Sequence, residues 1–316
     1  MGKFLKVCLI IGVVCVIAGV AASSAGVSFG GLNELKEQVL NGEWSFGDKI
    51  DLDIDPFFEL DEQHFFDDNE ILNQGVEAKT DNFAVAEVRE ISLKCAGVKV
   101  NFVAYDEGDT SVTNSSDILV QVEKTAKYQS YLKEGTLYIK ASSESKVTGN
   151  SKIDIMIPAL FLQSGGYDIK VEASASEISL GSLSAADVEI DMSAGVIGWE
   201  SLTAGELDVE MTAGTVNGVQ STVAGETDIS MSAGTVTIGG ILGTETQIKL
   251  SAGSVNLKLE DAYTAYNYNI SCAGGKVAVG TEIVEGIAKE LEIPNQAAKE
   301  IDVECSMGSV EISFAE

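Results

Sequence analysis

The chain has 316 residues, of which 49 are acidic and 20 are basic, so its formal net charge at pH 7 is −29. Such an acidic surface repels phosphate backbones and excludes nucleic acid as a partner. The composition, with 32 glycines and three prolines, is typical of a turn-rich β protein, and the length allows one large domain or two ordinary ones.

A hydrophobic segment follows Lys3 and Lys6. Residues 7–33 carry no charge, which is long enough for a helix to span the ~30 Å of hydrocarbon in a bilayer. Residues 1–33 therefore predict one N-terminal transmembrane helix, with the N-terminus in the cytoplasm because the positive residues precede the span. The alternative is a signal peptide that is cleaved after Ala22, where small residues offer a cleavage site.

Residues 34–84 predict an acidic stalk or linker, because Asp48–Glu70 carries ten carboxylates against one lysine. Four of these match positions 1, 3, 5 and 12 of an EF-hand calcium loop, at Asp51, Asp53, Asp55 and Glu62. Pro56, however, stands where the sharp turn of that loop requires glycine. We therefore favour a solvated spacer over a calcium site.

Residues 85–165 contain candidate strands at irregular spacing. They lie at 90–94, 98–104, 118–124, 136–141 and 153–157. An open end of a stack of strands must be covered, because exposed edges pair with other chains. We expect this region to be an irregular N-terminal part or cap of the β domain.

Residues 166–316 contain a repeated short sequence motif that ends in an Ala-Gly pair. The glycines of four copies, 19, 20 and 19 residues apart, are Gly195, Gly214, Gly234 and Gly253. Before each pair, apolar and polar residues alternate, which indicates half-buried strands. The period predicts an all-β fold, a single-chain parallel β-solenoid with about 20 residues per coil. An antiparallel sandwich is the alternative, but identity that recurs at 19–20 rather than at 10 favours parallel stacking.

The repeat loosens toward the C-terminus, where Gly274 and Gly308 are 34 residues apart. The surplus lies at Glu282–Lys299, which predicts a short helix that ends near Pro294. An alternating last strand follows, and together these segments predict a C-terminal cap.

Several segments together resemble a known family. They are Gly135-Thr136-Leu137-Tyr138-Ile139, Ile153-Asp154-Ile155-Met156-Ile157-Pro158, the serial Ala-Gly-x-Val strands and the ending Glu304–Ile312. They resemble the β-strand-repeat "putative adhesin" family of bacterial cell-envelope proteins of the Gram-positive type, over roughly residues 85–316. The resemblance implies a β-repeat fold at the cell envelope, often with one N-terminal membrane segment, and no established catalytic site.

The residues available for catalysis are few. The only histidine, His64, lies in the predicted stalk, so neither a Ser-His-Asp nor a Cys-His arrangement can be built inside the repeats. A polysaccharide lyase needs a basic residue beside calcium, but the only arginine, Arg89, precedes the regular coils, whose lysines are few (Lys170, Lys249 and Lys258). We therefore expect a protein that is not an enzyme, with no catalytic, cofactor-binding or metal-binding residues and no cofactor.

The cysteines have the pattern of structural residues. Cys95 and Cys272 are expected at the turn position that Ser193, Thr212, Ser232 and Ser251 hold in the regular coils. Cys272 and Cys305 would lie on adjacent coils, whose spacing of ~4.8 Å permits a disulfide. Cys305 is one residue out of phase with the repeat, so bridged and free thiols both stay open.

Stacking of the coils predicts an acidic strip of nine carboxylates on one sheet face. Its columns are Asp187, Glu206, Glu226 and Glu245; Glu189, Asp208, Asp228 and Gln247; and Asp191, Glu210, Ser230 and Lys249. The second strand of each coil predicts a neutral strip of Thr215, Asn217, Thr235, Thr237, Ser254 and Asn256. The acidic strip is either a solvated face that discourages sideways pairing or a face that binds cations or a partner, because opposed like charges destabilise a sheet.

These features favour a non-enzymatic, membrane-anchored, extracytoplasmic protein that presents a surface for adhesion or envelope assembly. Its expected partners are the membrane, through one N-terminal span, and an envelope protein or polysaccharide. The first alternative is an accessory or sensory protein of an envelope-stress system that acts through a membrane partner. The second is a carbohydrate-active enzyme.

Overall fold

The computed structural model of the chain describes residues 73–106, 117–143 and 151–315. The predicted membrane anchor, the EF-hand-like sequence and His64 lie outside the described residues. The chain divides into two units, residues 1–70 and residues 71–316, and the structure described below belongs to the second. Among the residues that are described, no helix is both long and apolar enough to cross a bilayer.

The second unit is built almost wholly of strands, which confirms the predicted all-β class. The strands are β1 (Asn73–Ala84), β2 (Glu90–Ala96), β3 (Lys99–Tyr105), β4 (Asp117–Lys133), β5 (Thr136–Ser142), β6 (Lys152–Pro158), β7 (Asp168–Ser174), β8 (Ser176–Ser179), β9 (Ser182–Val223), β10 (Glu226–Ile241), β11 (Glu245–Leu259), β12 (Tyr266–Val279), β13 (Glu282–Ile293) and β14 (Lys299–Phe314). Three short helical segments join them: η2 (Val85–Glu87), α5 (Ala159–Leu162) and η3 (Tyr263–Ala265).

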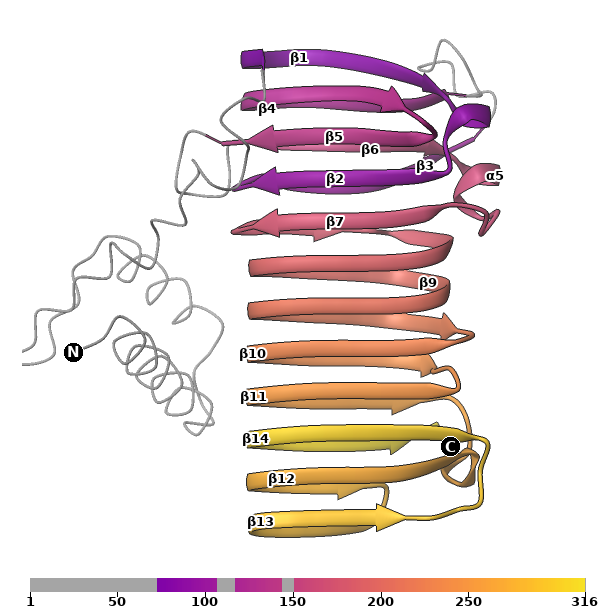
Figure 1. Cartoon of the computed structure of the whole chain (residues 1–316), viewed down its shortest axis with the longest axis vertical. Helices are drawn as coiled ribbons and strands as arrows, with labels where there is room; N and C mark the ends of the chain where they lie inside the picture. The colour runs from indigo at the N-terminus through magenta and orange to yellow at the C-terminus, as the bar shows by residue number, and fades with distance from the viewer. Residues whose placement is uncertain (1–72, 107–116, 144–150, 316) are drawn as a thin grey trace, which may run out of the picture. The chain divides into compact units, whose positions relative to one another are not determined.

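The strands from β7 to β11 stack in parallel, as the repeat period predicts (Figure 1). Met231 of β10 pairs with Met211 on one side and with Leu250 of β11 on the other, so each residue lies beside its counterpart in the next repeat. Inward-facing residues of neighbouring coils, such as Ile229 and Ile248, are buried against one another. Burial of this apolar column stabilises the stack by about 25 cal/mol for each Å² removed from water.

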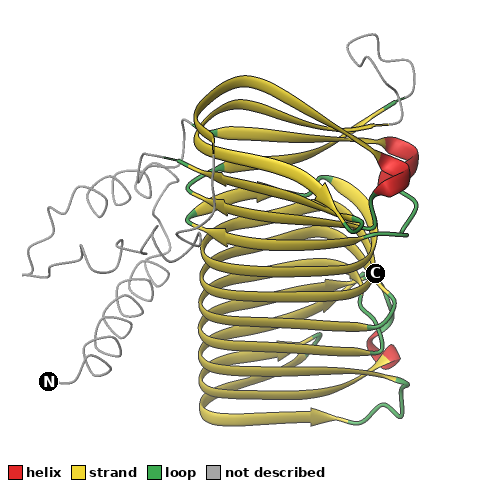
Figure 2. Ribbon diagram, turned by 45° about the horizontal axis from the view of Figure 1, so that its top comes forward, coloured by secondary structure: helices red, strands yellow, loops and turns green. Residues whose placement is uncertain are grey.

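A ladder of glycines explains why the Ala-Gly pair recurs. Gly234 is the register partner of Gly214 and of Gly253. The strands of each coil bend back on themselves (Figure 2). The φ angle of Gly234 is +141°, and a Cβ atom there would lie 2.0 Å from the carbonyl oxygen of Gly214. Only glycine combines a positive φ at low cost with room for so close a backbone approach.

The strand order departs from the chain order at both ends of the stack. At the C-terminal end β14 lies between β11 and β12, and parallel pairs join it to both. At the N-terminal end β2 lies between β5 and β7, and β3 lies between β6 and β8. Near each end of the stack, strands that are not next in chain order are therefore inserted between two others.

The prediction of a short helix at Glu282–Lys299 is wrong. The segment forms β13, which pairs antiparallel with β12. Without β13, the backbone groups along that side of β12 would lack partners, and satisfying them outweighs a weak local helical pattern. The β-branched pair Ile283-Val284 also favours a strand.

The opposite end of the stack is covered by antiparallel strands. β4 pairs with β5 along one part of its length and with β6 along another, and β1 pairs with β4. Residues 73–84, which were expected to belong to the stalk, thus form an edge strand of the β unit. The five candidate strands between residues 90 and 157 correspond to β2–β6, and only Val98 of the candidate at 98–104 lies outside its strand.

The cysteines do not lie at the turn position that was expected from the repeat. Cys95, Cys272 and Cys305 are buried in the inward column that contains Met192, because the relevant glycine after Cys272 is Gly275 and not Gly274. Cys272 and Cys305 are direct register partners, so the expected one-residue phase shift is also wrong. All three thiols are free.

A polar contact fixes the start of β14. The ammonium group of Lys299 contacts the carboxylate of Asp261 at 2.8 Å and donates a hydrogen bond to the carbonyl oxygen of Leu242 at 3.0 Å. The hydroxyl of Tyr266 donates to the same carboxylate at 2.8 Å. Lys299, followed by Tyr266, holds the pKa of Asp261 below its usual range despite partial burial.

Candidate functional site

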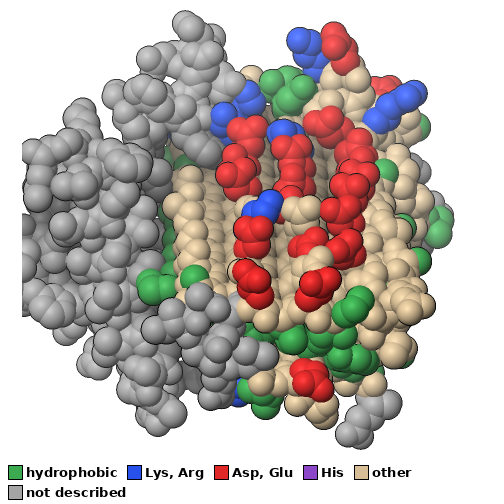
Figure 3. Space-filling model, turned by 60° about the horizontal axis from the view of Figure 1, so that its bottom comes forward, with side chains coloured by type: hydrophobic (Ala, Val, Ile, Leu, Met, Phe, Trp, Pro, Cys, Tyr) green, Lys and Arg blue, Asp and Glu red, His purple; other side chains and the backbone are tan. Residues whose placement is uncertain are grey.

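The acidic face is the outward surface of the first strand of each coil, from β9 to β14. Pairing between β10 and its neighbours confirms the predicted columns, because Asp228 pairs with Asp208 and Gln247, and Glu226 pairs with Glu245. Figure 3 shows acidic side chains gathered in columns on one face of the unit. Their side chains leave the face opposite the apolar column, as the alternation of the strands requires.

The insertion of β14 extends the acidic face beyond the predicted strip. Glu300, Asp302 and Glu304 of β14 pair with Glu245, Gln247 and Lys249 of β11, so each predicted column gains one carboxylate. Sequence reasoning missed these three residues because it had no signal that the last strand returns beside β11. The only available signal was their alternation with Ile301 and Val303, which are buried. This alternation predicts which face of the sheet the side chains are on, but not which strand lies beside β14.

Lysines border the acidic face at its β7 end. Lys170 of β7 contacts Glu189 of β9 across the strand pair at 2.6 Å, and Lys94 of β2 contacts Glu172 of β7 at 3.2 Å. These exposed pairs contribute little to stability. They nevertheless place a positive charge beside Glu172 and Glu189, the carboxylates at the β7 end of two columns.

Carboxylates on neighbouring strands perturb one another at the centre of the face. Partial burial raises the pKa of Asp208, and the carboxylates of Asp228, Glu189 and Glu210 raise it further. Lys170 opposes this shift from the end of the column. The acidic face therefore holds charge at a cost to the folded state, and an arriving cationic group would relieve that cost.

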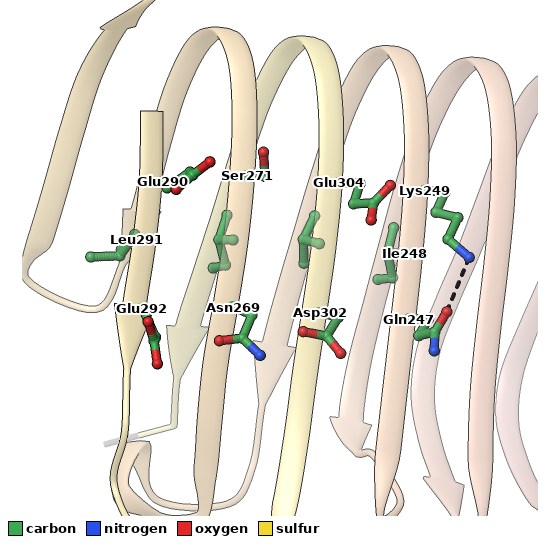
Figure 4. A pocket seen from close by; sticks show the side chains of 12 residues that line it. Gln247, Ile248, Lys249, Asn269, Ser271, Glu290, Leu291, Glu292, Asp302 and Glu304 are labelled. Atoms are coloured by element: carbon green, nitrogen blue, oxygen red, sulfur yellow. Dashed lines mark hydrogen bonds between the residues drawn. The ribbon is translucent and has the colours of Figure 1, made fainter. Parts of the chain in front are cut away.

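A shallow hollow of about 430 Å³ lies at the β13 end of the acidic face (Figure 4). Polar side chains line it in two rows, Gln247, Asp302, Asn269 and Glu292 in one and Lys249, Glu304, Ser271 and Glu290 in the other. The ammonium group of Lys249 donates to the side-chain oxygen of Gln247 at 3.1 Å. The hollow thus offers four carboxylates and one cation to a polar ligand, above a floor that includes Ile248, Val303 and Ile270.

The neutral strip lies on the second strand of each coil. Thr235 pairs with Thr215 and Ser254, and Thr237 pairs with Asn217 and Asn256, as predicted. The hydroxyl of Ser254 donates to that of Thr235 at 3.3 Å. Hydroxyl and amide groups repeated at the strand spacing can form hydrogen bonds with a second polar surface. Because the strip carries no charge, it does not favour one polar partner over another.

Residues with catalytic potential are dispersed in the part of the chain that the structure describes. There, no group of three or more His, Cys, Asp and Glu residues has the arrangement that would hold a metal ion. Arg89 lies just before β2, with its side chain beside Gly135, and Lys258 lies on the exposed side of β11. Neither lies in the hollow at the β13 end.

Parallel coils, a stacked glycine ladder and antiparallel end strands define an all-β protein built from a β-strand repeat. Residues 88–314 match the family model described as Toastrack DUF4097. The match covers well over half of the chain, so the chain belongs to the Toastrack DUF4097 family. This confirms the family resemblance drawn from the sequence. No curated protein matches the chain.

Several solved structures show similarity to the chain, among them the following three. A "putative cell adhesion protein" from Clostridium sporogenes is 14% identical, with 76% of this chain and 100% of that chain covered and a TM-score of 0.26. A "putative adhesin" from Bacteroides fragilis is 13% identical over 75% and 97%, with a TM-score of 0.32. One from Parabacteroides distasonis is 12% identical over 75% and 97%, with a TM-score of 0.31. These scores are low, so the description of the fold rests on the strand pairing of this chain alone.

Proposed function

We propose that this protein is a non-enzymatic component of the cell envelope, a membrane-anchored β-solenoid that presents its sheet faces for adhesion or envelope assembly. Residues 1–33 would form the anchor, with the N-terminus in the cytoplasm and the β unit outside. The partner would be an envelope protein or polysaccharide that carries positive charge or many hydrogen-bond donors.

The observation that carries this proposal is the acidic face, whose columns run across β9, β10, β11 and β14. Like charges directly opposed across a sheet destabilise it, yet Asp208 and Asp228 are direct partners and Glu245 and Glu300 repeat the arrangement. A fold keeps such unfavourable repulsion where the charged surface has a function that a neutral surface could not perform. Binding of a cationic partner is the simplest such use, because it removes the repulsion.

A binding assay with charge variants tests the proposal. Full-length protein in detergent would be incubated with envelope polymers and with solubilised envelope proteins, and retention would be measured. We expect the variant E206Q/D208N/E226Q/D228N to lose most of the binding. The matched control E134Q/E200Q/E260Q/E282Q removes four exposed carboxylates outside the acidic face and should bind like the wild type. Equal binding by both variants would contradict the proposal.

The runner-up function is that of an accessory or sensory protein of an envelope-stress system. Such a protein would act through a membrane partner that contacts residues 1–33. Replacing this segment with an unrelated transmembrane helix separates the two functions. An adhesive or assembly protein should keep its binding, whereas a membrane-coupled accessory should lose its phenotype.

The anchored topology has its own test. Protease added to intact, wall-stripped cells should digest the β unit while a fragment that contains residues 1–33 stays with the membrane. Release into the medium of a chain that starts near Ser23 would favour the cleaved signal peptide instead.

A further inference from the structure

Two buried thiols face each other where β14 enters the sheet. Cys272 of β12 and Cys305 of β14 are register partners, and their side chains are 1% and 3% exposed. Both point to the apolar side of the sheet. Neighbouring strands lie about 4.8 Å apart, within the range of about 4.4–6.8 Å that separates the Cα atoms of a disulfide.

The third described cysteine has no such neighbour. Cys95 of β2 pairs with Ala141 of β5 on one side and with Ala173 of β7 on the other. Its sulfur lies 3.5 Å from the hydroxyl oxygen of Ser176. Cys95 is therefore a buried thiol in the same inward column and serves as an internal control for Cys272 and Cys305.

The topology gives a bond at this place a mechanical consequence. β14 is connected to β12 through β13 and the turn before Lys299, so a covalent bond between β12 and β14 would close a loop that contains all of β13. Closing that loop lowers the conformational entropy of the unfolded chain. It would also prevent β14 from leaving its place between β11 and β12.

We propose that Cys272 and Cys305 form a disulfide when the chain folds in an oxidising compartment, and that this bond latches β14 into the sheet. The compartment rests on the proposed envelope location. The pairing rests on register and burial alone. The reaction needs an external disulfide as oxidant, either a small molecule of the glutathione class or a thiol oxidase.

The bond forms in two exchange steps. The thiolate of one cysteine attacks the external disulfide, forms a mixed disulfide and releases one thiolate. The thiolate of the second cysteine then displaces the other half. Two electrons pass to the external disulfide, and the two cysteine protons end on the two thiols that it becomes.

Burial determines when these steps occur. Burial, followed by the adjacent Cys272 thiol, raises the pKa of the Cys305 thiol to about 12. The closed coil therefore offers almost no thiolate for attack. The first exchange step therefore occurs during folding, before β14 is fully buried, and the pairing of β14 with β12 then brings the second thiol alongside. Once buried, the disulfide is shielded from reductants.

Refolding under controlled redox conditions tests the latch. Full-length protein that carries Cys8→Ser and Cys15→Ser would be unfolded, reduced and refolded in detergent, with and without a mixture of reduced and oxidised glutathione. After alkylation and proteolysis, mass spectrometry should find the Cys272 and Cys305 peptides linked and Cys95 alkylated. The linked protein should have a Tm about 5–10 °C above that of the reduced protein.

Variants and a timing control complete the test. Cys305→Ser should abolish the oxidation-dependent rise in Tm, whereas Cys95→Ser should retain it. Adding the oxidant after folding should link the pair at least tenfold more slowly than adding it during refolding. Recovery of all three cysteines as free thiols, or a linked form with an unchanged or lower Tm, would overturn the proposal. A pair that links in vitro but is free in protein isolated from cells under alkylation would contradict the envelope location and not the pairing.

Discussion

Gly308 of β14 lies directly beside Gly253 of β11, and a Cβ atom on Gly308 would lie 1.8 Å from the carbonyl oxygen of Gly253. The glycine ladder thus continues through a strand that arrives from the far end of the chain. The inserted strand copies the bend of the regular coils, including a φ angle of +136° at its glycine. The ladder is therefore a structural requirement of the stack and not a by-product of sequence repetition.

Two adjacent glycines give a sharp test of this ladder. A Cβ atom at Gly275 would lie 1.7 Å from the carbonyl oxygen of Gly308, whereas at Gly274 the nearest atom would be 3.9 Å away. We expect Gly275→Ala to lower the free energy of unfolding by more than about 3 kcal/mol, because backbone must move and φ is +142°. Gly274→Ala should change it by less than about 1 kcal/mol. Denaturant titration of both variants measures the difference, and equal effects would refute the assigned register.

The alternation of β10 predicts a second contrast. Val236 is fully buried, and Thr237 faces outward beside Asn217 and Asn256. Val236→Asp should cost several kcal/mol, because it places an unpaired charge in the apolar column. Thr237→Asp should be nearly neutral. Thermal unfolding followed by circular dichroism measures both, and equal loss of stability would show that the two faces have been misassigned.

The acidic face should make stability depend on pH with an unusual sign at Asp208. Its folded pKa is raised above 3.8, chiefly by burial and then by Asp228, so the charged form is disfavoured in the folded state. The contribution of Asp208 is most favourable below pH 3.8 and is lost as the pH rises through the folded pKa. Asp208→Asn should therefore have a higher Tm than the wild type at pH 7, and the difference should disappear near pH ~3.

Asp261 provides the control of opposite sign. Lys299 and Tyr266 lower its folded pKa, so its contribution is present above pH 3.8 and is lost as the pH falls through the folded pKa. Asp261→Asn should lower the Tm at pH 7, with a smaller loss under strongly acidic conditions. If both asparagine variants shift the Tm in the same direction at pH 7, the electrostatic account of the acidic face is wrong.

Salt dependence separates a solvated acidic face from one that binds cations. The spacing of neighbouring coils is smaller than the Debye length of ~10 Å at 0.1 M salt, so repulsion along the columns is only partly screened. We expect Tm to rise modestly with any salt, and calcium chloride to match sodium chloride at equal ionic strength. A larger rise with calcium that is lost in E206Q/D208N/E226Q/D228N would instead identify the columns as a cation site.

Much of the stack could be predicted from sequence because its register is encoded locally. The sequence motif from Val188 to Gly195 determines which residues are buried and where each coil bends. Its recurrence aligns β9, β10 and β11. The acidic columns follow directly from that alignment. The neutral strip follows in the same way, because each of its residues keeps a fixed distance from the ladder glycine.

The position of β14 could not be predicted, because the local pattern does not choose between neighbours. Gly253 is equally compatible with Gly275 and Gly308, since each glycine is preceded at the third position by a residue that fits the inward column. Because two glycines, Gly274 and Gly275, follow one another, the sequence did not show which of them aligns with the ladder, and the position of Cys272 in the repeat was misassigned. The pairing of β12 with β13 depends on which edge remains open, and that is a property of the whole sheet.

The insertion of β14 has a consequence for the order of events during synthesis. β14 leaves the ribosome after both strands that it joins, so the sheet cannot become continuous across β11 and β12 while the chain is still growing. Contacts of such long sequence separation slow folding. Until β14 arrives, two open strand edges face each other and can capture other chains. A chain that stopped before Lys299 would keep those edges permanently, so premature termination should yield an aggregating protein rather than a slightly shorter one.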